Sequence, residues 1–140
     1  MTRGAPLATG DHAELTRTVA PRDIELFTEI SGDRNPLHYD EAAARASRFG
    51  EIVVQGGITS AILNAVVAEE LPGPGTVFLN VNWDFKAPVR PGDTITCTGT
   101  VVSKYEKDGL HLVDCEIAAE NQQGEKCAIG NATVALPKRS

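Results

Sequence analysis

The chain has 140 residues, the usual size of one domain with its own core, and we expect a single domain over 1–140. Hydrophobic residues make up 41% and charged residues 23%, which excludes collagen, a long coiled coil and general disorder. Thirteen Lys and Arg against nineteen Asp and Glu give a net charge of −6, which argues against a nucleic-acid partner and against an anionic membrane surface.

The first 13 residues are polar, lack an apolar run of signal-peptide length, and predict a loose leader on a cytoplasmic chain. No apolar run approaches the roughly 18–20 residues of a membrane span. The three cysteines lie far apart without a C-x-x-C pair, a pattern that favours buried free thiols in a reducing compartment. With only three histidines, a multi-histidine metal site is not expected.

The first half of the chain has helical patterns. Residues 15–19 predict a short strand, and Pro21 suits the first position of a helix that Gly32 can terminate. Asp40 can cap a second, Ala-rich helix over 41–48. We therefore expect two short helices before the most apolar part of the chain.

The second half combines one long apolar helix with strands. Residues 56–71 are apolar on nearly every side, which predicts a central helix enclosed by other structure. A strand of about ten residues with period-two alternation begins at Thr76, and turn residues follow it over 88–93. An antiparallel meander then runs through 94–106, 110–120 and 125–136. The pattern indicates an α+β fold in which the sheet wraps the central helix.

The most informative loop holds Asp33 and His38, five residues apart. Asn35-Pro36 lies between them and prevents a continuing helix, so the two side chains can converge. A carboxylate and an imidazole together can exchange protons with a shared water. The spacing alone favours the structural alternative, in which Asp33 caps a turn and His38 has no chemical role.

A polar stripe is a second feature of the central helix. Gly56, Ser60 and Asn64 recur at every fourth position and so share one face. The free amides at the helix start, with the helix dipole, can stabilise a carbonyl oxygen that gains negative charge. The alternative is that Gly56 permits close packing while Ser60 and Asn64 bond to backbone carbonyls.

Three motifs carry a resemblance to a known family. GDRNPLH at 32–38, FGEIVVQG at 49–56 and FKAPVRPGD at 85–93 are similar to those of MaoC-type (R)-specific enoyl-CoA hydratases. The resemblance covers roughly 15–136. It implies the hot-dog fold, in which an antiparallel sheet wraps a long helix, a homodimer with sites at the subunit interface, and no cofactor.

The resemblance also implies residue roles. Asp33 and His38 hold a water that adds to the double bond of a trans-2-enoyl-CoA, or of the corresponding acyl-carrier-protein thioester, and Asn35 helps to arrange the loop. The backbone N–H of Gly56 polarises the thioester carbonyl. The expected product is the (R)-3-hydroxyacyl thioester, or the reverse dehydration takes place.

The chain departs from that family at three positions. Gln55 stands where relatives usually have His, Gly57 where a larger apolar residue is common, and Asn64 where close relatives have Ser. We interpret Gln55, Gly57, Ser60 and Asn64 as substrate-binding residues that adjust the pocket. Gln55 can exchange hydrogen bonds but cannot titrate, so we expect it to shape the start of the helix.

Basic residues can form a rim for the phosphates of CoA or of a carrier-protein arm. The candidates are Arg48, Lys86, Arg90, Lys104 and Lys107, of which Lys86 and Arg90 lie in the third motif. Each can equally be a solvated charge at a strand end. Two alternative functions remain at this stage: a hot-dog thioesterase and a non-catalytic module that binds acyl thioesters.

Overall fold

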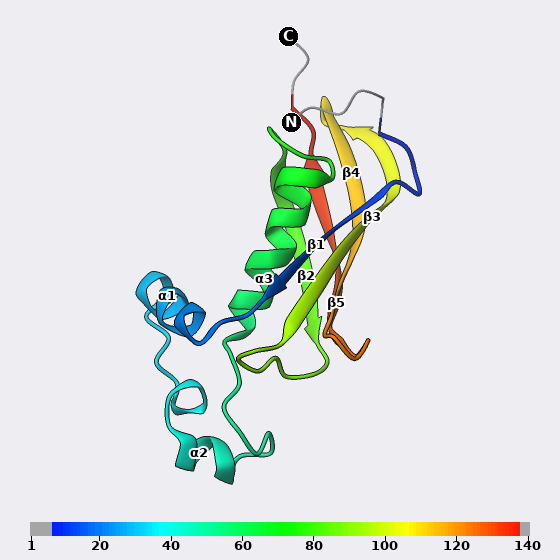
Figure 1. The fold of residues 1–140 in the computed structure, drawn as a ribbon. Helices are drawn as coiled ribbons and strands as arrows, with labels where there is room; N and C mark the ends of the chain where they lie inside the picture. Colours follow the sequence, from blue (N-terminus) through cyan, green and yellow to red (C-terminus); the bar gives the residue numbers. More distant parts are fainter. Residues whose placement is uncertain (1–6, 138–140) are drawn as a thin grey trace.

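The computed structural model describes residues 7–137. A five-stranded antiparallel sheet in the order β1-β3-β4-β5-β2 curves around the helix α3, while the helices α1 and α2 form a separate lobe beside the start of α3 (Figure 1). The elements are β1 (His12–Thr18), α1 (Pro21–Ser31), α2 (Glu41–Ala46), α3 (Gly56–Ala65), β2 (Val77–Phe85), β3 (Thr94–Lys107), β4 (Leu110–Glu120) and β5 (Lys126–Ala135). The expected α+β hot-dog architecture is confirmed.

The sheet confirms the predicted meander of β3, β4 and β5. The strand β2, although it precedes β3 in the chain, does not extend that meander as a neighbour of β3. That strand pairs with β5 and not with β3, so the turn residues after β2 do not close a hairpin. The connecting segment instead crosses to the start of β3 and passes the residues that precede α3. There the buried Val89 accepts a hydrogen bond from the N–H of Val54 at 2.8 Å. This crossing holds the third motif beside the start of the central helix.

The central helix packs one face against the sheet. Leu63, Val66 and Val67 are at most 1% exposed, and the regular α-helix passes at Val66 into a π-helical turn that ends at Glu70. The opposite face is open, because Gly56 and Asn64 are exposed. The expectation of a helix enclosed on every side is therefore wrong for a single chain, since one curved sheet covers only one side of α3.

The N-terminal segment is more ordered than the sequence predicted. β1 begins at His12, opposite Thr100 of β3, and Leu7 is buried in the core. The expected loose leader over 1–13 is wrong for residues 7–13, and residues 1–6 lie outside the described part. The strand predicted over 15–19 therefore begins earlier, because its first residues turn only Ala13 toward the core and give too weak an alternation to mark the start. Between residues 7 and 137, no helix is long and apolar enough to cross a membrane.

The three cysteines are free and buried, as predicted. Burial, with a smaller contribution from Cys127, raises the pKa of Cys97 to about 12. Burial, with a smaller contribution from Asp114, raises the pKa of Cys115 to about 11. These thiols therefore behave as small apolar core residues.

The helices α1 and α3 meet at a glycine. A Cβ atom at Gly57 would lie 2.0 Å from Cζ of Phe27, which is far inside van der Waals contact. The missing side chain therefore lets the Phe27 ring lie directly on the first turn of α3. This contact places α1, and the loop that follows it, against the start of the central helix.

We expect Gly57→Ala to destabilise the protein by about 1–3 kcal/mol, the usual cost of overpacking. Denaturant unfolding of the purified variant measures the change. In a Phe27→Leu background the same substitution should cost less, because the shorter side chain leaves room for the new methyl group. Equal costs in the two backgrounds would contradict the proposed contact.

Candidate active site

The loop after α1 brings Asp33 and His38 together. α1 ends at Gly32, whose φ of 79° suits glycine and whose N–H bonds to the carbonyl of Thr28 at 2.7 Å. Asn35 then caps a single 3-10 turn, Pro36–His38, by accepting the N–H of Leu37 at 3.1 Å. As a result, Oδ2 of Asp33 lies 3.9 Å from Nε2 of His38.

A backbone contact orients the imidazole. Nδ1 of His38 lies 2.6 Å from the carbonyl oxygen of Val53. A carbonyl can only accept, so Nδ1 carries the hydrogen, and in the neutral ring Nε2 presents its lone pair toward Asp33. The distance of 3.9 Å is too long for a direct hydrogen bond between the two side chains. It lets one water beside the pair donate a hydrogen to each.

The cavity next to this pair has a volume of about 330 Å³. His38 and Asn35 lie on its wall together with Gly56, while Phe85 and Val89 add apolar surface. As the first residue of α3, Gly56 has an amide without an acceptor inside the helix, at the positive end of the helix dipole. A Cβ there would lie 3.1 Å from the Phe85 ring, so glycine keeps the approach to this amide open.

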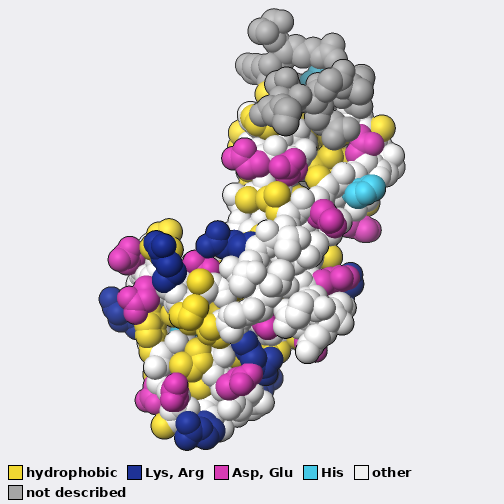
Figure 2. All heavy atoms as spheres, in the orientation of Figure 1, with side chains coloured by type: hydrophobic (Ala, Val, Ile, Leu, Met, Phe, Trp, Pro, Cys, Tyr) yellow, Lys and Arg dark blue, Asp and Glu magenta, His cyan; other side chains and the backbone are white. Residues whose placement is uncertain are grey.

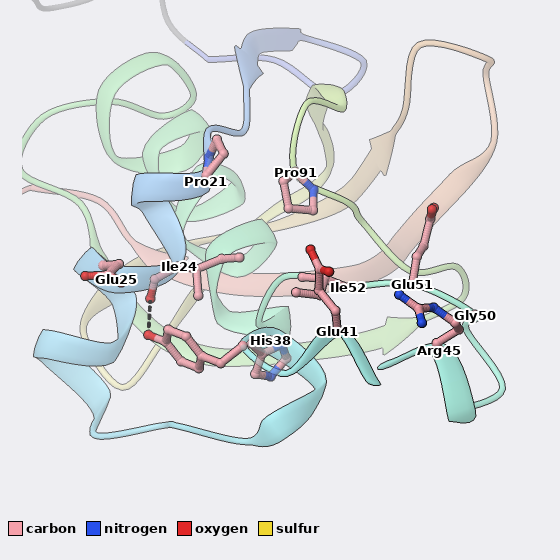
Figure 3. A pocket seen from close by; sticks show the side chains of 11 residues that line it. Pro21, Ile24, Glu25, His38, Glu41, Arg45, Gly50, Glu51, Ile52 and Pro91 are labelled. Atoms are coloured by element: carbon pink, nitrogen blue, oxygen red, sulfur yellow. Dashed lines mark hydrogen bonds between the residues drawn. The ribbon is translucent and has the colours of Figure 1, made fainter. Parts of the chain in front are cut away.

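A second cavity of about 560 Å³ lies on the other side of His38 (Figure 3). It is lined by Ile24 of α1, Glu41 of α2 and the segment around Glu51. Although it is larger, Gly56 does not line it, and Asp33 lines neither cavity. We therefore assign the chemistry to the smaller cavity, where His38 and the free helix amide meet, with Asp33 beside His38.

Two of the expected pocket residues are buried under α1 instead. Gln55 is 1% exposed, and its Nε2 donates to the carbonyl of Ile24 and to Oγ1 of Thr28, both at 3.1 Å. Gly57 is covered by Phe27. Neither lines the cavity, because both residues face the neighbouring helix. The expectation that Gln55 shapes the start of α3 by hydrogen bonding agrees with these contacts.

Of the polar stripe, Gly56 lines the cavity, whereas Ser60 and Asn64 do not. Oγ of Ser60 donates to the carbonyl of Gly56 at 3.4 Å, as the structural alternative predicted, and Asn64 is exposed on the open face of α3. The stripe is therefore not buried in the single chain. Sequence analysis missed Thr59, which is 2% exposed and lines the cavity. A threonine among apolar helix residues was the signal that could have found it.

The basic rim is smaller than expected. Arg48 and Lys86 line the cavity. Arg90 forms an ion pair with Glu51 and donates to the carbonyl of Phe49 at 3.4 Å, so it ties down the loop before α3. Lys104 donates to the carbonyl of Leu7, and Lys107 ends β3 without lining the cavity. On the face in Figure 2, the Lys and Arg side chains around the lower lobe are mixed with Asp and Glu.

Comparison with known proteins identifies the family. The family model described as a MaoC like domain matches residues 5–123. The chain belongs to the MaoC-like domain family. The resemblance carried by the three motifs is thereby confirmed. In the described part of this MaoC-like chain, no three His, Cys, Asp or Glu side chains are grouped as metal ligands would be.

Several relatives match over most of their own length. An (R)-specific enoyl-CoA hydratase of Rhodospirillum rubrum is 36% identical over 132 residues, covering 93% of this chain and 88% of that protein. A mitochondrial 3-hydroxyacyl-[acyl-carrier-protein] dehydratase of Arabidopsis thaliana is 30% identical, covering 94% and 78%. The unliganded structure of the R-hydratase PhaJ1 from Pseudomonas aeruginosa has a TM-score of 0.86 at 36% identity, covering 95% and 84%.

Proposed function

We propose that this protein adds water to a trans-2-enoyl thioester to give the (R)-3-hydroxyacyl thioester, and catalyses the reverse dehydration. The observation that carries the proposal is the oriented pair of Asp33 and His38 beside a cavity that also presents the amide of Gly56. The names of the relatives, which include hydratases and dehydratases of acyl thioesters, support the same reaction class.

The pair activates the water. A water that donates one hydrogen to Oδ2 of Asp33 and the other to Nε2 of His38 keeps its lone pairs free for the β-carbon of the enoyl group. His38 is held for this step, since its Nδ1 hydrogen is engaged by the carbonyl of Val53. As the C–O bond forms, one hydrogen of the water passes to the pair.

The amide of Gly56 stabilises the other end of the reacting system. Attack at the β-carbon moves electrons through the double bond onto the thioester oxygen, where the N–H of Gly56 and the helix dipole can stabilise the charge. The enolate then collapses and takes the proton from the pair at its α-carbon. Because the same pair handles both steps, the hydroxyl and the hydrogen add to one face of the double bond.

Dehydration uses the same groups in reverse, so both directions follow from one site. A thioesterase would direct the water at the carbonyl carbon and release a free thiol. An assay with crotonyl-CoA separates these functions: hydration consumes the enoyl absorbance without thiol release, and thioester hydrolysis releases CoA. Neither signal would support a module that only binds acyl thioesters.

We expect Asp33→Asn and His38→Ala each to lower kcat for crotonyl-CoA by about 100- to 10,000-fold, because each removes an acid-base partner of the water. Steady-state hydration kinetics measure the loss, and circular dichroism verifies that both variants fold. His111→Ala is a suitable control, because His111 lies on β4 away from the cavity and pairs with the exposed Glu106. Near-normal turnover by a folded Asp33 or His38 variant would contradict the mechanism.

The proposed carrier is CoA, bound through its phosphates at Arg48 and Lys86. Both residues line the cavity, and neither forms an ion pair among the salt bridges of the described residues. Arg48 also packs over the ring of Phe49, 4.9 Å from its centroid, which places the guanidinium at the cavity wall.

We expect Lys86→Glu to raise KM for crotonyl-CoA more than it lowers kcat, because a reversed charge repels phosphates without touching the reacting atoms. The increase should shrink at high salt. Lys104→Glu provides the matched control, since Lys104 contacts Leu7 and lies outside the cavity. Equal KM values for the Lys86 variant and the wild type would contradict CoA binding at this rim.

The proposal includes a homodimer. β2 is an edge strand, and it leaves Val77, Leu79 and Val81 between 37% and 58% exposed. A second copy that pairs along β2 would cover the unpaired edge and the apolar side chains together.

We expect Leu79→Lys and Val81→Lys to convert the protein to monomers, measured by size-exclusion chromatography with light scattering, and to lower activity. Val102→Lys is the matched control, because Val102 is 40% exposed on β3 and away from the β2 edge. A fully active monomer would contradict the dimeric site. The proposal also places the protein in the cytoplasm, which the three free thiols support.

A further inference from the structure

The hydroxyl of Thr28 lies at the centre of a buried hydrogen-bond network beneath the catalytic loop. Thr28 is 4% exposed and belongs to the last turns of α1. Its Oγ1 lies 2.8 Å from the carbonyl oxygen of Asp33 and 3.1 Å from Nε2 of Gln55, and it contacts the hydroxyl of Tyr39. The network therefore joins α1, the catalytic loop and the residue before α3.

Counting hydrogens assigns a direction to each of these bonds. The carbonyl of Ile24 accepts the helical N–H of Thr28 and a hydrogen from Nε2 of Gln55, which occupies both of its lone pairs. Oγ1 of Thr28 lies 3.0 Å from the carbonyl oxygen of Ile24 and 2.8 Å from that of Asp33. Its single hydrogen is therefore donated to the carbonyl of Asp33. Tyr39 and Gln55 are then donors to Oγ1, because the other acceptor near the Tyr39 hydroxyl, the carbonyl of Ile24, is 3.5 Å away. The Thr28 oxygen thereby uses its full bonding capacity.

We propose that Thr28 is a positioning residue that holds Asp33 at its distance from His38, with Tyr39 and Gln55 supplying the donors that orient its hydroxyl. This inference rests on the proposed function. The Asp33 side chain is 38% exposed, and among the contacts described it accepts one backbone hydrogen bond, from the N–H of Asn35. The position of the Asp33 carboxylate therefore depends on the Asp33 backbone, which the hydroxyl of Thr28 holds against α1.

The two halves of the pair are thus anchored to different elements. His38 is fixed by the carbonyl of Val53, in the segment before α3, whereas Asp33 is fixed by Thr28 of α1. Gln55 links the two supports, because it donates to Thr28 and lies two residues from Val53. Figure 3 marks the long contact of 3.5 Å between the hydroxyl of Tyr39 and the carbonyl oxygen of Ile24, on the side of α1 that faces the loop of His38.

Thr28→Val tests the inference, because valine keeps the shape and removes the hydroxyl. We expect kcat to fall about 10- to 100-fold, the effect of a shift of about 1 Å in a catalytic group, with KM within about twofold of the wild type. Thr28→Ser retains the hydroxyl and should restore most of the turnover. Thr133→Val is the matched control: it removes a hydroxyl that donates to Asp114 in the sheet, and should leave kcat unchanged.

Tyr39→Phe tests the direction of the network. We expect a smaller loss of kcat from this variant alone and no further loss when it is added to Thr28→Val, because its donor acts only through the Thr28 oxygen. Losses that multiply in the double variant would overturn the assignment. Wild-type turnover by folded Thr28→Val, in a protein that Asp33→Asn inactivates, would overturn the positioning role while leaving the proposed function intact.

A readout without substrate separates the two proposals. The N–H of Asn35 bonds to Oδ1 of Asp33 at 3.0 Å, so its hydrogen exchange reports how firmly Asp33 is held. We expect this amide to exchange at least about tenfold faster in Thr28→Val than in the wild type, with the sheet amides unchanged. Unchanged exchange at Asn35 would overturn the inference even if the wild-type protein proved inactive toward enoyl thioesters.

Discussion

The hydrogen bond between Nδ1 of His38 and the carbonyl of Val53 connects the chemistry of this protein to its fold. It selects the tautomer that leaves Nε2 free, and it attaches the catalytic loop to the segment that leads into α3. The return bond from the N–H of Val53 to the carbonyl of Leu37 strengthens the same attachment. Since α3 also provides the amide of Gly56, one short segment sets the position of the proposed base, His38, relative to the proposed carbonyl-binding amide.

Two of the three positions at which the sequence was expected to depart from the family, Gln55 and Gly57, form one structural unit. Gln55 and Gly57 flank Gly56 in sequence, and both face α1: the first donates to Ile24 and Thr28, and the second makes room for Phe27. These residues change the contact between two helices, and they leave the cavity lining alone.

One face of α3 is left uncovered by the sheet of the single chain. A sheet of five strands can cover one side of a helix. It leaves the other side of α3 exposed at Gly56 and Asn64. The unpaired edge of β2 carries exposed apolar residues on the same subunit. Small and polar residues on a helix inside a hot-dog fold are therefore compatible with a second subunit, since the first one does not bury them.

The sequence by itself determined the class of fold and predicted that Asp33 and His38 lie together. Helical and period-two patterns are local, and so is the Asn-Pro turn that separates Asp33 from His38, which is why both could be recognised without coordinates. The tertiary structure alone decided three contacts: β2 pairs with β5, Phe27 covers Gly57, and Arg90 forms an ion pair with Glu51. Each of these joins residues far apart in the chain or selects one partner among several charges. Neither local spacing nor composition contains that information, because it depends on how the sheet curves around α3 and on which side chains that curvature brings into contact.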